Sequence, residues 1–222
     1  MLKADAEEAA PIVRLTFDAI LAITTGQGRP GADLRTAIGD FNAHALPLLQ
    51  SDQSGPPLLH IFELTRKNGA TLPQLALVRA TTSSRSPATL GARLIKNSLI
   101  HLSLATEARV IADTVFKSRQ AAEDMKDEMA DAFDDMEEIA ADDMDTGSYA
   151  ALVDLDAAVA DYLMTAQRPL PYMLNFQFAG PAPDLVFAHR LYHDAGRSDE
   201  LREENGVIHP LFMPPFGRAL AS

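Results

Sequence analysis

The chain contains no cysteine and no tryptophan among its 222 residues. Without cysteine, neither a disulfide framework nor a thiolate metal site can form. No apolar run reaches the roughly 18 residues that a membrane-spanning helix needs. The N-terminal sequence MLKADAEE is acidic too early to be a secretory signal. We therefore expect a soluble chain, made in a reducing compartment, that has no membrane as a partner.

Positive charge is also scarce. The chain carries 19 Lys and Arg residues against 31 Asp and Glu residues, which gives a formal net charge of −12 and a pI near 4.8. Proteins that bind nucleic acid gain affinity where clustered Lys and Arg release counterions from phosphates. Here the basic residues are scattered along the sequence. We therefore do not expect direct contact with nucleic acid.

Helical periodicity is the main signal in residues 1–87, which we predict to be an N-terminal helical region. Pro11 predicts that the first helix begins at that residue, because proline suits a first turn and not a helix interior. Asp33 is a good N-cap for a second helix. Residues 58–64 fit either a short helix or a strand. The Ser- and Thr-rich residues 81–87 indicate a linker, and they are the best internal boundary.

Residues 88–168 predict a long helical hairpin. Its first arm is exceptionally long and is expected to be interrupted near Ser118. An acidic stretch within it keeps apolar residues three or four apart, which is typical of an amphipathic helix with a carboxylate-covered back. The apolar stripe consists of Met125, Met129, Phe133, Met136 and Ala140. The carboxylates lack the register of a calcium-binding EF-hand loop, so a solvated face or a surface for a basic partner is favoured.

Residues 169–222 predict a small C-terminal βααβ module. Residues 172–178 alternate as a strand does. A helix follows, and we expect Gly196 to close the turn after it by taking a positive φ. Ser198 is placed to cap the next helix, and Gly206 to end that helix. The predicted fold is therefore mainly α, with helical N-terminal parts and this βααβ module at the end.

Several features near the C-terminus keep a characteristic order and spacing. They are the sequence AHRLY at 188–192, Asp194, Arg197, the sequence DEL at 199–201, Asn205 and the sequence HPLFMP at 209–214. With these features, residues 97–220 resemble the C-terminal part of the Mu-like phage DNA-circularisation (DNA circulation) protein family. The resemblance implies a component of a phage or phage-like tail, at the baseplate or tube end. It also implies assembly into the virion tail in the bacterial host cytoplasm.

The same ending resembles a LysM module, which is a small βααβ fold. The residues that carry this likeness are the sequence GPAPDL at 180–185, Tyr192, Leu201, Asn205, Ile208 and residues 215–217. In cell-wall enzymes such modules bind glycan chains, and in contractile-tail baseplates they hold protein parts together. Here GPAPDL stands in place of the usual Gly-Asp-Thr-Leu entry.

The resemblance places partner-binding residues in the C-terminal module. They are Tyr192, Arg197, Leu201, Asn205, His209, Pro210 and Phe212. No catalytic residues, metal ligands or cofactors are expected. His189 and His193 are four residues apart, as zinc ligands on a helix can be, but they lack the HExxH pattern. No GxSxG nucleophile sequence occurs either, so an enzyme is not indicated.

Three functions from different classes follow from these observations. The first is a structural tail or baseplate subunit that assembles with other tail proteins and with copies of itself. The second is a protein that binds and circularises the ends of injected phage DNA. The third is a glycan-binding module that acts on peptidoglycan. The acidic composition favours the first over the second.

Overall fold

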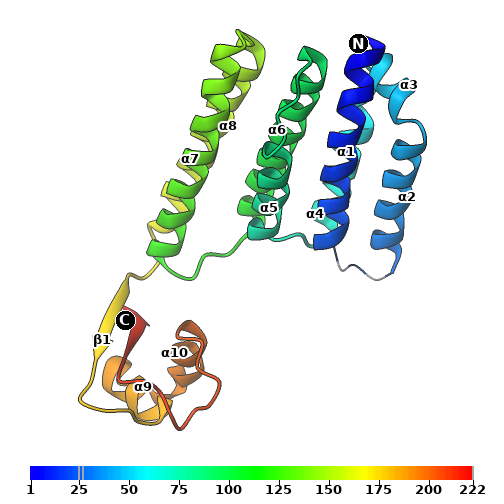
Figure 1. The fold of residues 1–222 in the computed structure, drawn as a ribbon. Coiled ribbons are helices and arrows are strands. Elements are labelled where there is room, and N and C mark those ends of the chain that lie inside the picture. The colour runs from blue at the N-terminus through cyan, green and yellow to red at the C-terminus, as the bar shows by residue number, and fades with distance from the viewer. Residues whose placement is uncertain (25, 27, 222) are drawn as a thin grey trace. The chain divides into compact units, whose positions relative to one another are not determined.

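The computed structural model describes residues 1–24, 26 and 28–221. In these residues the chain is mainly helical and has one small antiparallel sheet, as the sequence predicts (Figure 1). The elements are α1 Lys3–Ile23, α2 Arg29–Ala43, α3 Ala45–Gln50, α4 Gly55–Lys67, α5 Leu72–Ser83, α6 Leu90–Asp113, α7 Arg119–Asp142, α8 Thr146–Gln167, β1 Met173–Gln177, α9 Asp184–Tyr192, the 3-10 helix η1 Ala195–Arg197, α10 Ser198–Glu204 and β2 Phe216–Leu220.

The chain divides into two compact units, and each is described by itself. The first unit comprises Met1–Thr114 and Asp131–Val159, and the second comprises Val115–Ala130 and Ala160–Ser222. Helix α6 lies in the first unit beside α1, α4 and α5 (Figure 1). The predicted boundaries after residues 87 and 168 stay predictions.

Helix α1 starts eight residues before Pro11, at Lys3, so the prediction that it begins at the proline is wrong. The reason is packing. Ala6 and Ala9 are fully buried in the core of the first unit, and their burial holds the first turns in helical form. Pro11 itself lies on the exposed side of the helix.

Two further expectations for the N-terminal helices need correction. Helix α2 begins at Arg29, with Pro30 in its first turn, and not at Asp33. Proline is pre-organised for that position, since its fixed φ is already helical and it has no N–H to leave unsatisfied. Residues 58–64 lie within helix α4, and α5 continues through Ser83 into the predicted linker.

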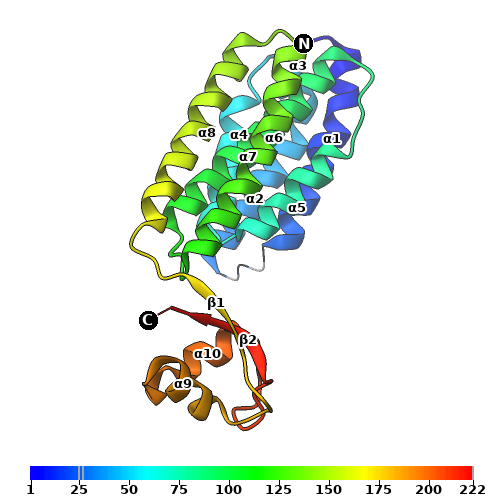
Figure 2. The same ribbon diagram turned by 90° about the vertical axis from the view of Figure 1, so that its left-hand side faces the viewer.

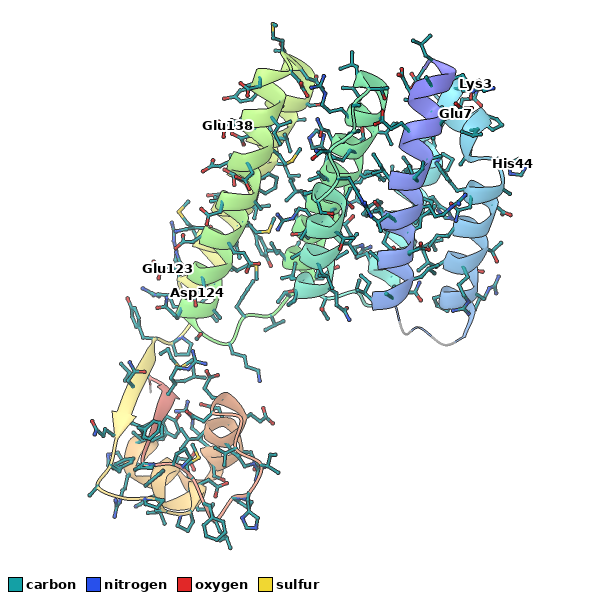
Figure 3. The ribbon with its side chains drawn as sticks, viewed as in Figure 1. Lys3, Glu7, His44, Glu123, Asp124 and Glu138 are labelled. Carbon is teal, nitrogen blue, oxygen red and sulfur yellow. The ribbon has the colours of Figure 1, made fainter. Side chains whose placement is uncertain are left out.

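The predicted interruption near Ser118 is confirmed, because α6 ends at Asp113 and α7 begins at Arg119. The Ser118 hydroxyl accepts a hydrogen bond from the Ala121 backbone N–H at 3.1 Å, and this bond caps the new helix. The amphipathic character of α7 is also confirmed. Met129, Phe133 and Met136 are buried, while the side chains of Glu123, Asp124 and Glu138 are exposed and project from one side of the helix (Figure 3).

In the second unit, β1 and β2 pair antiparallel, from Met173 opposite Leu220 to Gln177 opposite Phe216 (Figure 2). Between them the chain forms α9, η1 and α10 in order. The small core under the sheet is built mainly from large side chains. It consists of Phe176, Phe187, Ala188, Leu201, Met213 and Ala219. The likeness of this arrangement to a LysM module stays a prediction.

The turn after α9 differs from the prediction in one residue. His193, and not Gly196, takes the left-handed conformation, with φ of 56°. Its N–H donates to the His189 carbonyl at 3.0 Å, so the helix closes one turn earlier than expected. Gly206 has φ of 61° and ends α10 as predicted.

Glu63 on α4 joins α4 to α6 through charge. Its carboxylate accepts hydrogen bonds from Arg66 at 2.9 and 3.3 Å and from Arg109 on α6 at 3.0 Å. The hydrogen bond from Arg66 is the largest cause that lowers the pKa of Glu63 from 4.5 to about 2. Because the folded pKa is below the unfolded one, the stabilisation is complete above about pH 4.5 and is lost as the pH falls toward 2.

We expect Glu63→Gln to lower the free energy of unfolding at neutral pH by about 1 kcal/mol, after allowance for solvent screening, and the Tm by roughly 2–4 °C. Thermal unfolding followed by circular dichroism across pH 2 to 7 measures the effect. The difference from the natural protein should shrink below about pH 4.5. Glu7→Gln is the matched control, because Glu7 makes only a 3.7 Å pair with Lys3 on the exposed surface (Figure 3). Equal changes in both variants would contradict the assignment.

Candidate functional site

The predicted partner-binding residues divide into a packed group and an exposed group. Leu201 is 0% exposed and lies in the small core, so it cannot contact a partner in this conformation. Its apolar side chain stabilises the module instead. This corrects the prediction for Leu201, and the reason is that α10 turns that face toward Phe187 and Met213.

Tyr192 and Arg197 contact one another. The Arg197 guanidinium lies 3.8 Å from the centre of the Tyr192 ring, which is a cation–π contact. The same guanidinium donates to both carboxylate oxygens of Glu200, at 2.6 and 3.1 Å. Burial is the first cause that raises the pKa of Tyr192, and the Glu200 carboxylate is the second. These contacts hold the end of α9 against the start of α10, and they leave only part of either side chain for a partner.

Asn205 acts as a clasp between α10 and β2. Its side-chain amide donates to the Leu201 carbonyl at 2.8 Å and to the Arg218 carbonyl at 2.7 Å. Its side-chain oxygen accepts from the Arg218 N–H at 2.7 Å. Among the described residues, strand β2 pairs with β1 along one edge only, and on its other edge the Asn205 side chain takes the place of a neighbouring strand for the backbone of Arg218. Its polar atoms are committed within the module.

His209, Pro210 and Phe212 form the exposed group, on a stretch that we call the 208–212 loop. Ile208 is 96% exposed and Phe212 is 70% exposed, and Leu211 is exposed between them. The His209 and Phe212 rings lie 5.1 Å apart, and the Phe212 N–H donates to the His209 carbonyl at 3.2 Å. The loop is thus an ordered turn that presents large apolar side chains to solvent.

The 208–212 loop is fastened to the segment that enters α9. The Asp184 N–H donates to the Pro210 carbonyl at 2.8 Å, and Ala182 and Met213 form an isolated antiparallel bridge. Leu185 follows directly and is also exposed. The fold therefore places the GPAPDL segment at 180–185 beside the 208–212 loop.

A small polar cavity of about 40 Å³ lies in the first unit, between α6 and the turn from α7 to α8. Asn97 is 7% exposed, and its amide donates to Asp143 at 3.3 Å. Its side-chain oxygen and Nε2 of His101 have no hydrogen-bond partner among the described residues. Burial lowers the pKa of His101, although Asp145 opposes this shift. Sequence reasoning missed this pair because both residues fall within the apolar pattern of α6.

Neither a metal centre nor a membrane span is found in the described part of the chain. No group of three or more His, Asp or Glu side chains there is placed to hold a metal ion. His189 and His193 have ring centres 6.4 Å apart. No described helix combines the length and the hydropathy that crossing a membrane requires.

Gly217 packs against the Asn205 side chain, so a substitution at Gly217 tests whether the Asn205 clasp stabilises the module. A Cβ at Gly217 would lie 2.2 Å from the Asn205 side-chain oxygen and 2.8 Å from the Phe176 ring. We expect Gly217→Ala to destabilise the C-terminal module by about 1–3 kcal/mol, because overpacking displaces the clasp. Amide hydrogen exchange in β1 and β2 should become roughly tenfold faster or more.

Gly180→Ala is the control for that substitution. A Cβ at Gly180 meets no heavy atom within 4 Å, so the exchange rates should stay unchanged. Equal protection of the two strands in both variants would show that the clasp does not hold β2.

No protein-family model matches the chain, and no curated protein matches it. The resemblance to the DNA-circularisation family therefore stays a prediction.

Proposed function

We propose that this protein is a structural component of a phage or phage-like tail or baseplate, and that it works by docking to other tail proteins through its C-terminal module. Copies of the chain are among the partners in this proposal. The observation that carries it is the 208–212 loop, which holds exposed apolar side chains in a fixed turn. Exposed apolar groups on an ordered frame are typical of protein interfaces.

Burial of this loop against a partner would supply the binding free energy. A large apolar side chain that moves from water into an interface contributes about 1.5–3 kcal/mol. Ile208 and Phe212 are both mostly exposed, so both have most of that contribution still to gain. The turn is already ordered by the His209 and Pro210 contacts, which lowers the entropy cost of docking.

The site favours a protein partner over a glycan. A sugar needs hydrogen-bonding side chains, and the Asn205 amide is already bonded to Leu201 and Arg218. The groups left exposed near the loop are largely apolar, including Leu185 and Leu211. The resemblance in residues 188–214 agrees with a tail component, and the net charge of −12 disfavours the ends of DNA as a ligand.

The double substitution Ile208→Ser and Phe212→Ser tests the proposal. We expect the variant to lose its place in purified tail particles, or to bind its tail partner at least about tenfold more weakly. Mass spectrometry of the particles and light scattering of the purified chain measure these outcomes. The Tm should not change, because both side chains are on the surface.

Val115→Ser is the matched control, because Val115 is 90% exposed and also belongs to the second unit. It should assemble as the natural chain does. A protein that is strictly monomeric and absent from particles would refute the proposal. Salt-sensitive retention of linear DNA, or capture by peptidoglycan that Phe212→Ser abolishes, would favour one of the other two functions instead.

A further inference from the structure

A second surface lies elsewhere, in a cleft of the first unit between α2 and α4 that has a volume of about 670 Å³. That volume is within the range of sites that bind ligands or peptide segments. Its floor is apolar, with Phe41, Leu48 and Leu64 among the lining residues. We call it the acidic cleft, for the reason given next.

Acceptor groups from α2 follow one wall of the acidic cleft. Asp33 and Asp40 are seven residues apart, which is about two helical turns or roughly 10 Å along the axis. His44 lies one turn beyond Asp40 and projects from the end of α2 (Figure 3). Its Nδ1 lies 3.0 Å from the Asp40 carbonyl. Since a carbonyl only accepts, Nδ1 is the donor in this contact, and in the neutral form of the ring Nε2 is an acceptor.

In the described residues, no Lys or Arg side chain forms an ion pair with these acceptors. Neither the Asp33 nor the Asp40 carboxylate has a salt-bridge partner there, and no Lys or Arg lines the cleft. This differs from Glu63 and Glu107, whose carboxylates pair with arginines of neighbouring helices. The cleft therefore has an apolar floor and a wall whose charge is complementary to a cation.

We propose that the acidic cleft binds an amphipathic helix of a partner protein, which lays its apolar face on the floor and places Lys or Arg residues seven positions apart against Asp33 and Asp40. A helix suits the site because α2 and α4 form its two sides and because the carboxylates repeat with a helical spacing. The inference does not depend on the 208–212 loop, so either surface can fail in experiment without the other.

The test uses the full chain and two synthetic amphipathic helical peptides with the same apolar face. One peptide carries Lys at two positions seven apart, and the other carries Glu at the same positions. Fluorescence anisotropy should show the Lys peptide bound about tenfold more tightly at low salt, because each surface ion pair changes affinity by roughly two- to fivefold. Asp33→Asn with Asp40→Asn should remove that preference.

Charge reversal makes the test specific to the cleft. The variant Asp33→Lys with Asp40→Lys should prefer the Glu peptide over the Lys peptide. Glu123→Gln with Asp124→Asn is the control, since it removes the same charge from exposed positions on α7 and should bind as the natural chain does. Circular dichroism checks that each variant is folded.

Three results would overturn the proposal. One is equal binding of the two peptides by the natural chain. Another is unchanged preference in the charge-reversed variant. The third is a change in the oligomeric state of the Asp33→Asn, Asp40→Asn variant with no binding of either peptide, which would assign the cleft to a second copy of this chain.

Discussion

The first unit depends on helix α6, which is buried on more than one side. Apolar residues such as Ile95 and Leu104 are buried together with the polar residues Asn97, Ser103 and Glu107. Burial of a polar group costs free energy unless the group is hydrogen-bonded. Glu107 pairs with Arg79 of α5 at 3.2 Å and also accepts from the Ser103 hydroxyl. Because the buried Glu107 carboxylate of α6 needs Arg79 as its partner, α5 must lie beside α6.

In the C-terminal module, several of the residues that carry the family resemblance have structural roles. Tyr192, Arg197 and Asn205 bond within the module, and Leu201 fills its core. Such residues keep a fold without touching a partner. These residues hold the frame that carries the 208–212 loop. Exposure of the apolar side chains of this loop to water does not stabilise the fold, so they indicate an interface.

The two proposed surfaces use different physics. The 208–212 loop, between α10 and β2, exposes large apolar side chains, so burial of apolar surface would dominate its binding. The acidic cleft combines an apolar floor with uncompensated carboxylates, so its binding would weaken as salt is added. An assembly that uses both would respond separately to salt and to apolar substitutions.

Local periodicity and local caps are enough to predict the mainly helical fold, the break near Ser118, the apolar stripe of α7 and the strand β1. Other features depend on contacts between residues that are far apart in the sequence. Burial of Ala6 and Ala9 holds the residues before Pro11 in helix α1. The acidic cleft and the Asn97–His101 cavity also arise only when distant helices meet, since spacing along one helix does not reveal which neighbour faces it.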